Sequence, residues 1–456
     1  MRILGTKIFL TLVAIGMCRA SLAQPGAASE PFTLQQAVSL ALRQSPDHQA
    51  AALDVDAASI NERLAKSSLL PTMAFTETAS RGNDPVYVFG ARLRQQNFSQ
   101  AGFALNALNR PTPIGNFSTR FSGDWLAFDS WKSEFAIRSA TGKTKSAQLA
   151  VTRADQEIVH RVVIAYQGVL IAGKQLEVAR HQVGTAQALL DSSKSRVGSG
   201  LAVDSDQLSA EANLAARQQE QISAGGDFEI AWAELERVVG APIPDQQRKM
   251  PELSAVQLEP QPLTGSIITA LRTRPDRKSL EEIATASHAE VLAGRSSFAP
   301  TLHAFGDWEA DRRSFAGSGG NNWMAGVELN IDILPIAKRQ QLQEAHIAEE
   351  RAHVAGQSVE AQIRLEVTRA WYGEQSASRM VEVAQAARTQ TEESLRILRN
   401  RYGAGLATMT DLLRGEDAER QTEAGYWAAI SRSRIAWSDL KFAMGTLVSG
   451  NLDDLQ

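Results

Sequence analysis

The sequence predicts a mostly α-helical protein with a small β part, built from two similar halves that each carry two strands and a long antiparallel coiled-coil hairpin. Three observations predict this fold class. Residues 114–241 and 336–456 contain no proline, the residue that interrupts helices. Apolar residues between 151 and 190 recur in alternating steps of three and four, which is the seam of a coiled coil. Finally, 196–240 aligns with 401–445 without a gap.

Composition and charge bound the class of protein. The chain has 456 residues, of which 43% are hydrophobic and 21% charged, and its formal net charge is −4. Such a chain can bury a large core. Its slight acidic excess argues against a nucleic-acid partner, which requires a basic surface. The single cysteine, Cys18, lies in an N-terminal segment that we expect to be removed. Disulfides and cysteine-ligated metal sites are therefore excluded from the mature chain.

Residues 1–23 have the pattern of a signal peptide. Arg2 and Lys7 precede a short apolar run, and Ser21-Leu22-Ala23 forms the small-x-small cleavage pattern. No other run approaches the roughly 18 apolar residues that a transmembrane helix needs, so we expect none in the mature protein. An exported chain of this kind is periplasmic, secreted or a β-type outer-membrane protein.

The chain contains an internal duplication. RVGSGLAVDSDQLSAE at 196–211 matches RYGAGLATMTDLLRGE at 401–416, and LRQSPD at 42–47 matches LRTRPD at 271–276. Clustered prolines between the halves indicate an extended linker. The predicted units are the signal peptide at 1–23, a first repeat at 24–241, a Pro-rich linker at 242–262, a second repeat at 263–448 and a tail at 449–456.

Each half is expected to begin with two helices. Pro46 and Pro275 each fit the first turn of the second helix, where a missing N–H costs nothing. That helix then runs to about residue 70 or 298, until Pro71 or Pro300 ends it.

Segments with alternating apolar and polar residues follow, and they predict two strands in each half. The clearest is 323–333, with 302–310 as its hairpin partner across a glycine-rich turn at 317–322. In the first half, the strands are 117–125 and the weaker 73–80. The long connection between them, 81–116, contains Phe89, Phe98 and Phe103, which we expect to be buried.

A very long helix follows each pair of strands. The first is expected at about 132–196, roughly 100 Å long at about 1.5 Å per residue. In the second half, the corresponding spacing of apolar residues between 359 and 384 is less regular. Both helices are expected to end at Gly-x-Gly turns, because glycine is common where a helix stops in the left-handed conformation. An antiparallel return helix then begins.

The strands carry an apolar face, for which periodicity alone leaves two interpretations. The face either packs on the chain's own helices or contacts lipid, with tryptophans near the strand ends as an interfacial girdle. Four strands cannot close a membrane barrel, and open sheet edges are not tolerated in lipid. Three copies would give 12 strands, and two copies would give eight with little lumen. The candidate lipid-facing residues are Trp125, Trp308, Trp323, Val327, Leu329 and Ile331.

The combined pattern resembles the TolC-type outer-membrane efflux channel family. The resemblance covers nearly the whole mature chain and is carried by FTLQQAVSLALRQSPD, by the Leu-Pro-Thr and Ala-Pro-Thr strand starts, and by RYGAGLATMTDLL. It implies a homotrimer with a 12-strand outer-membrane barrel and a long periplasmic tunnel of helices. It also implies docking to a periplasmic adaptor and an inner-membrane pump, most often of the RND type.

The resemblance places a gate at the helical-hairpin tips, 197–206 and 402–411. Asp411 would form an acidic ring in a trimer, which favours cations. The second acid of the family falls on Arg414, so a double ring is not expected. In the simpler interpretation, Asp206 and Asp411 only start the return helices, where acids favour the helix dipole.

The resemblance also implies a lock between the tips. Tyr402 and Asp206 match a tyrosine and an aspartate of the closed-state lock in the family. The basic partner of that lock falls on Ala407, so the latch either differs or uses Arg401.

The tips are also the expected contact with the adaptor. Turn formation alone is the other interpretation of their glycines. The candidate docking residues are Gly198, Gly200, Leu201, Gly403, Gly405 and Leu406.

No pattern in the sequence supports catalysis, a cofactor or a metal site. His346 and His353 are seven residues apart, about 10 Å on a helix, too far for one ion. Nucleotide-binding, metalloprotease and nucleophile-elbow motifs are absent. The sequence therefore predicts a passive export duct rather than an enzyme. The alternative is a soluble periplasmic coiled-coil scaffold without conductance. The transported substrate stays open between drugs, metal ions, solvents and polypeptides.

The mature N-terminus is the first testable consequence. We expect cleavage after Ala23, so that Gln24 is the first residue in intact-mass and N-terminal peptide spectra. The rival is lipidation at Cys18, which the bulky Met17 before it disfavours. A diacylglyceryl-cysteine in the mass spectrum would contradict cleavage near Ala23.

Overall fold

The computed structural model describes residues 31–249, 251, 253, 262–450 and 452. The expected signal peptide, its cleavage site and Cys18 lie outside the described residues. The linker 242–262 and the tail 449–456 are described only in part, so their boundaries stay predictions.

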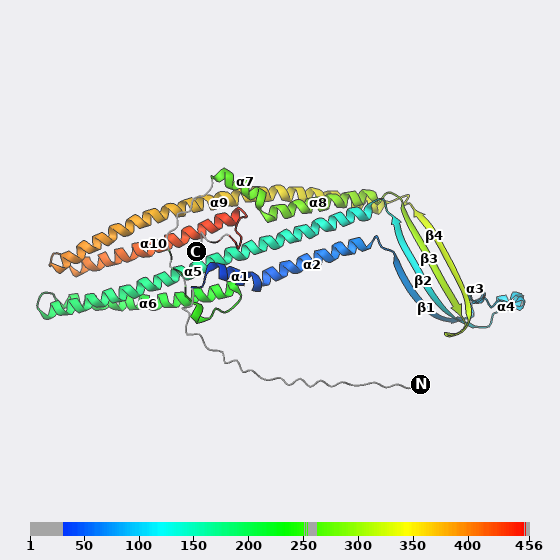
Figure 1. Cartoon of the computed structure of the whole chain (residues 1–456), viewed down its shortest axis with the longest axis horizontal. Helices are drawn as coiled ribbons and strands as arrows, with labels where there is room; N and C mark the ends of the chain where they lie inside the picture. The colour runs from blue at the N-terminus through cyan, green and yellow to red at the C-terminus, as the bar shows by residue number, and fades with distance from the viewer. Residues whose placement is uncertain (1–30, 250, 252, 254–261, 451, 453–456) are drawn as a thin grey trace, which may run out of the picture.

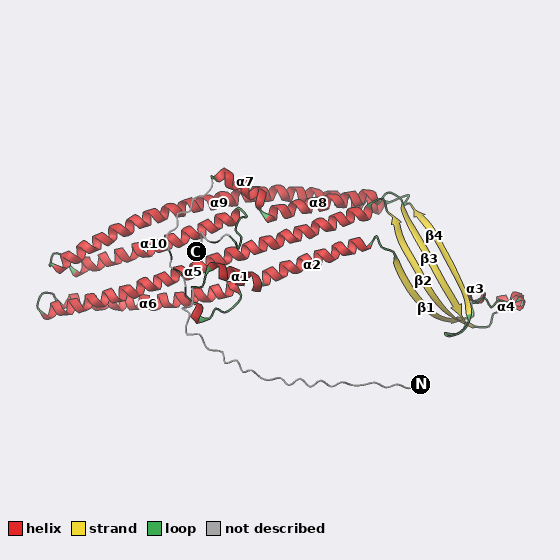
Figure 2. Cartoon of the chain, viewed as in Figure 1, coloured by secondary structure: helices red, strands yellow, loops and turns green. Residues whose placement is uncertain are grey.

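The structure is an elongated bundle of long helices with a four-stranded sheet at one end, which confirms the predicted fold class (Figures 1 and 2). The elements of the two halves correspond in order and length. The first half contains α1 (Leu34–Gln44), α2 (Pro46–Ser67), β1 (Thr72–Gly82), β2 (Ile114–Phe128), α5 (Lys132–Gly198) and α6 (Asp204–Val239). The second half contains α7 (Leu263–Thr273), α8 (Pro275–Ser296), β3 (Thr301–Arg312), β4 (Gly319–Asn330), α9 (Ile336–Gly403) and α10 (Met409–Ala443). A 3-10 turn, η2 (Asp245–Gln247), follows α6.

Local sequence signals set the helix ends. The Thr33 hydroxyl and the Gln36 side chain form a capping box at the start of α1, and Pro46 and Pro275 begin α2 and α8 as expected. The predicted helix at 132–196 is confirmed as α5, which has 67 residues, and α9 has 68.

The four strands form one antiparallel sheet in the order β1-β2-β3-β4. Its register brings Phe75, Phe121, Trp308 and Trp323 into one row across all four strands. Two sequence predictions were wrong here. β4 ends at Asn330, so Ile331 lies after the strand, and β4 begins at Gly319, so only the first part of the glycine-rich segment forms the turn. Cross-strand pairing of 319–322 with the end of β3 extends the hairpin.

The connection between β1 and β2 contains a small helical insert. It holds α3 (Pro85–Arg94), a 3-10 turn η1 (Gln100–Phe103) and α4 (Leu105–Asn109). Phe98 stacks edge-on against Phe89 and Phe103, at centroid distances of 5.0 and 4.8 Å. Phe103 is nevertheless 62% exposed, so the expectation that all three rings are buried was wrong. Ring-on-ring contact covers only one side of this side chain.

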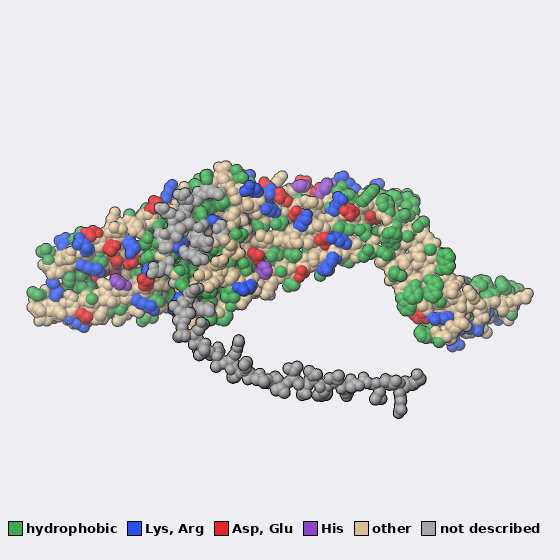
Figure 3. Space-filling view, viewed as in Figure 1, with side chains coloured by type: hydrophobic (Ala, Val, Ile, Leu, Met, Phe, Trp, Pro, Cys, Tyr) green, Lys and Arg blue, Asp and Glu red, His purple; other side chains and the backbone are tan. Residues whose placement is uncertain are grey.

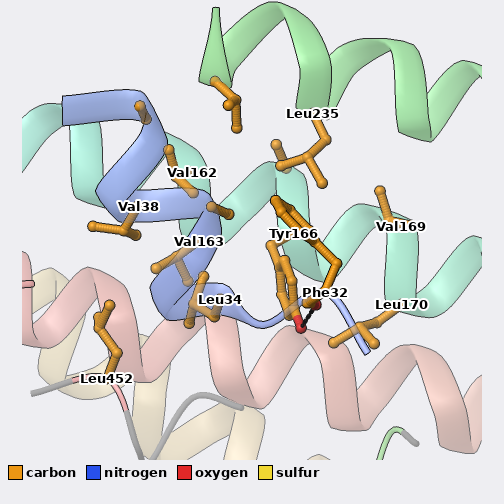
Figure 4. Packing of buried hydrophobic residues seen from close by; sticks show 14 of the residues in the cluster. Phe32, Leu34, Val38, Val162, Val163, Tyr166, Val169, Leu170, Leu235 and Leu452 are labelled. Atoms are coloured by element: carbon orange, nitrogen blue, oxygen red, sulfur yellow. Dashed lines mark hydrogen bonds between the residues drawn. The ribbon is translucent and has the colours of Figure 1, made fainter. Parts of the chain in front are cut away.

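The helices lie in a layer with a defined lateral order. α5 packs against α2 and α6 on one side and against α8 and α10 on the other, and α9 lies outside α8 and α10. The largest core lies where α1, α5, α6 and α10 meet (Figure 4). There the Tyr166 hydroxyl donates to the Phe32 carbonyl at 2.9 Å, and Trp232 is fully buried. This core joins the two halves at mid-length of the molecule.

One described helix, α5, is long and apolar enough to cross a membrane by length and composition, where the sequence analysis expected none. Of the 18-residue window that qualifies, 56% is buried inside the protein. The apolar residues of this window include Val162, Val163 and Val169, which pack in the core of Figure 4. Burial in that core therefore accounts for the composition of α5.

Candidate functional site

The two hairpin tips have the same backbone design. In each, the leucine after the Gly-x-Gly turn donates its N–H to the arginine carbonyl five residues earlier, at 2.8 Å in both cases. Gly200 and Gly405 have φ of +72°, a conformation that glycine adopts without strain. Leu201 and Leu406 remain 72% and 68% exposed. The tips therefore present apolar side chains to their surroundings.

Asp411 caps α10. Its carboxylate accepts from the Thr408 hydroxyl at 2.7 Å and from the Thr408 N–H at 3.2 Å, which completes a capping box. These bonds, and then the charges of Arg414 and Arg401, hold the pKa of Asp411 below its ordinary value. The carboxylate is thus kept ionised.

Arg401 does not reach the other hairpin. Its guanidinium donates to the Leu406 carbonyl at 3.4 Å, within its own tip. In this protomer the Arg401 side chain thus helps to close the turn that follows it, and its part in a latch stays a prediction.

At the tips, a cation that joins the two hairpins is Arg196, which the sequence analysis missed. Its guanidinium lies 5.1 Å from the ring centroid of Tyr402 and donates to the Gly403 carbonyl at 3.2 Å. A signal was present, because Arg196 and Arg401 occupy equivalent positions in the repeat. The comparison of the two repeats considered only Arg401, the arginine on the second hairpin.

Tyr402 sits between the hairpins with 8% of its surface exposed. Its hydroxyl has no hydrogen-bond partner among the described residues. Burial raises the pKa of Tyr402, the charge of Asp206 raises it further, and Arg196 lowers it. The structure thus brings Tyr402 and Asp206 into electrostatic contact, with Arg196 as the nearby cation. A small apolar cluster holds this site together, formed by Leu190, Ala210, Leu395, Tyr402, Met409 and Leu412.

The sheet has one apolar and one polar face. Trp323, Val327 and Leu329 of β4 are 78%, 72% and 62% exposed, and Trp308 and Trp125 are 41% and 46% exposed. Figure 3 shows hydrophobic side chains over the sheet and its junction with the helices. On β3, this face runs from Trp308 to Leu302, about 20 Å at about 3.4 Å per residue. Ile331 is also 54% exposed, but it lies beyond the end of the strand.

The opposite face carries charge. Glu309 accepts from Ser118 at 2.6 Å and from Arg120 at 3.0 Å, and Arg94 of the insert bonds to the same carboxylate. Residues 118, 120 and 309 alternate along β2 and β3 with the apolar ones, so they line the other side of the sheet. A sheet with these two faces suits a wall between lipid and water.

In the described part of the chain, no group of three or more His, Cys, Asp or Glu side chains could hold a metal ion. His346 lies 3.5 Å from Glu349, which His288 contacts at 2.7 Å.

Comparison with known proteins identifies the family. The family model described as "Outer membrane efflux protein" matches residues 37–241 and 267–446, most of the chain. The chain belongs to the outer membrane efflux protein family. It is therefore an outer-membrane channel for efflux or secretion, and the TolC-type resemblance of its sequence is confirmed.

Individual relatives agree with this assignment. The alkaline protease secretion protein AprF of Pseudomonas aeruginosa is 25% identical over 427 residues, which cover 91% of this chain and 84% of AprF. The CmeC outer membrane channel of Campylobacter jejuni has a TM-score of 0.75 at 16% identity and covers 97% of this chain and 94% of CmeC. VceC of Vibrio cholerae has a TM-score of 0.74 at 18% identity, with 90% and 96% covered. The two solved structures show the fold.

The contact between Arg196 and Tyr402 gives a prediction for the channel. Replacement of Arg196 by Ala removes the stacking and the bond to Gly403, together worth about 1–2 kcal/mol. We expect the hairpins to separate more often and the single-channel conductance in planar bilayers to rise. Arg196→Lys keeps the charge without the planar stack and should give an intermediate result.

Arg180, an exposed arginine of the same helix, is the matched control. Arg180→Ala should leave the conductance unchanged. An Arg196→Ala channel that behaves as the unmodified channel would show that this contact does not restrain the tips.

Proposed function

We propose that this chain forms a homotrimer, in which three four-stranded sheets close one 12-strand barrel in the outer membrane and the helices continue as a periplasmic tunnel. The observation that carries the proposal is that both edges of the sheet are open. Among the described residues, β1 pairs only with β2, and β4 pairs only with β3. In lipid, the backbone groups of these edges need partners. β4 of one copy and β1 of the next can supply them.

The helices support the same closure. α2 and α6 lie on the β1 side of the layer and α9 lies on the β4 side, so one neighbour would cover a sheet edge and a helix edge together. Both helix edges carry exposed apolar residues. On α2 and α6 these are Leu53, Ile60, Leu64, Leu208, Ile222 and Ile230, and on α9 they include Ile347, Val354, Met380 and Val383.

The soluble-scaffold alternative accounts less well for the sheet. A soluble protein would cover the row Phe75, Phe121, Trp308 and Trp323, yet these rings are 41–78% exposed. We assign this face, with Trp125, Val327 and Leu329, to lipid, with the tryptophans near the membrane boundaries.

The channel is proposed to be passive, with energy supplied by an inner-membrane pump through a periplasmic adaptor. A pump of the RND type is the first candidate. The similarity to AprF, a protease secretion protein, makes a secretion system the second. In the trimer, three copies of Asp411 would face a narrow entrance and favour cations.

The tips are the proposed contact with the adaptor. A Cβ atom added at Gly198, Gly200, Gly403 or Gly405 would meet no atom within 4 Å. Packing inside the protomer therefore does not explain the glycines at 198 and 403, which lie in helices. With the exposed Leu201 and Leu406, they leave a shallow apolar surface open to another protein.

Membrane fractionation and conductance test the proposal. The mature chain should fractionate with the outer membrane, run as a trimer in detergent and conduct in planar bilayers. A monomer that is soluble without detergent would contradict the proposal. In water, the backbone groups at the sheet edges can bond to solvent and need no strands from other copies.

Leu406→Asp tests the docking surface. A charge at this exposed site should abolish efflux in cells by blocking apolar contact, while the trimer and its bilayer conductance are retained. The matched control is Leu105→Asp, a change at a leucine of the insert that is 79% exposed. Efflux that survives Leu406→Asp would exclude the tips as the docking site.

A further inference from the structure

A polar cavity lies between the two hairpins, above the tips. It is a partly open cavity of about 80 Å³, lined by residues of α5, α6, α9 and α10. One wall is acidic, because Glu416, Asp417, Glu419 and Glu423 of α10 all face it. Since these helices belong to both hairpins, the cavity exists only while the hairpins are joined.

Ion pairs cross the cavity. Arg217 of α6 has its Nη2 at 3.0 Å from Asp417 Oδ1 of α10 and its Nη1 at 2.8 Å from Glu220 of its own helix. Arg420 of α10 lies 3.9 Å from Glu220. These four side chains form an alternating set of charges that links the first hairpin to the second. The guanidinium of Arg217 is only 13% exposed, so the link is partly shielded from solvent.

The other charged groups around the cavity lie mainly on the second hairpin. Arg399 of α9 is 3.5 Å from Glu416, and Arg388 of α9 is 3.6 Å from Glu423. Glu392 of α9 adds a further negative charge near Glu419. From the first hairpin, His181 of α5 lines the cavity as well.

Joining of the hairpins disfavours the ionised forms of Glu416 and Glu419. Burial raises the pKa of Glu416, against the attraction of Arg399. Burial also raises the pKa of Glu419, and the neighbouring carboxylate of Glu423 raises it further. Glu419 has no ion-pair partner within hydrogen-bonding range among the described residues. Both groups therefore hold their protons to a higher pH in the joined arrangement than in water.

We propose that this cavity is a second lock between the hairpins, which takes up protons as the periplasm acidifies and thereby holds the gate shut. The inference rests on the proposed channel and on the prediction, made above for Arg196, that separation of the hairpins raises conductance.

Proton linkage sets the direction of the pH effect. Separation lets water into the cavity and returns Glu416 and Glu419 toward the ordinary glutamate pKa of 4.5. The joined state thus binds more protons than the separated state, and falling pH shifts the equilibrium toward it. A difference of half a proton over two pH units changes the equilibrium about ten-fold. As the pH rises, ionisation of the buried Glu416 and Glu419 favours separation, because separation returns these carboxylates to water.

Conductance of the full mature chain in planar bilayers, at about pH 7.5 and about pH 5.5, tests the proposal. For the unmodified channel, we expect the open probability of the periplasmic entrance to fall several-fold on acidification. The double variant Glu416→Gln with Glu419→Gln imitates the protonated state. Its open probability should be low at both pH values, with no pH response.

Two controls separate the carboxyls from other causes. His181→Gln removes the cavity's histidine and should retain the acid response. Glu234→Gln changes an exposed glutamate of α6 that pairs with Arg237 outside the cavity, and should also retain it.

A second measurement does not depend on conduction. Spin labels at Leu208→Cys of α6 and Ile397→Cys of α9 report the separation of the two hairpins by pulsed EPR, and Cys18 is the only native cysteine. Acid should shift the distance distribution toward the shorter distances in the unmodified background. In the double glutamine variant, the shorter distances should dominate at both pH values.

The outcomes are distinguishable. A double variant with the unmodified acid response, or loss of the response in His181→Gln, would overturn the proton lock. A channel that conducts equally at both pH values would overturn it as well, while leaving the proposed channel function intact. A mature chain without conductance at any pH would contradict the channel function itself.

Discussion

The open edges of the sheet constrain everything else about this molecule. Each edge leaves backbone N–H and C=O groups unpaired, and the proposed contact of the exposed aromatic row with lipid would place these groups where water is absent. Covering helices could protect such edges in a soluble protein, but here the helices lie beyond the end of the strands (Figure 1). In the proposed trimer, pairing with identical copies satisfies both edges at once. The lateral order of the helices, which matches the order of the strands, lets one neighbour satisfy sheet and bundle together.

The sheet and the bundle are connected by short, rigid links. Three residues separate β2 from α5, and the Asp129 carboxylate accepts from the Ser133 N–H at 2.7 Å, which fixes the start of the helix. Trp131 takes a left-handed conformation with φ of 65° in this link. α5 then runs for about 100 Å without interruption. This short link ties the direction of α5 to that of β2, so we expect changes in the width of the proposed tunnel to arise at the far tips rather than at the sheet.

Sequence pattern predicted most of the fold because helix seams, proline positions and strand alternation are local properties. The register across the sheet is not a local property, because it depends on which residues of neighbouring strands pair. Ile331 continues the alternation of β4, yet β3 has no residue left to pair with it, so the strand ends first. At the tips, the family resemblance pointed to Tyr402 and Asp206, and the helix-start pattern placed Asp411 in the first turn of α10, as the structure does. The sequence analysis missed Arg196, because the choice between two equivalent arginines depends on how the hairpins pack. The sequence also could not predict the cavity around Glu419, because it is formed where four helices that are distant in sequence pack together.

The distribution of apolar contacts explains how such tips can move while the channel stays assembled. The core at mid-length is large and joins α1, α5, α6 and α10, whereas the cluster at the tips contains six buried residues. Between them, Trp427 of α10 lies 4.7 Å from the Lys174 ammonium of α5 and 5.8 Å from the Arg388 guanidinium of α9. Such contacts tolerate small rotations better than interlocked apolar side chains do. Below this level, the hairpins are joined mainly by ion pairs, one stacked arginine and a few apolar residues. Local opening requires least free energy where fewest apolar contacts are lost, so the hairpins should part from the tips upward and stop at the mid-length core.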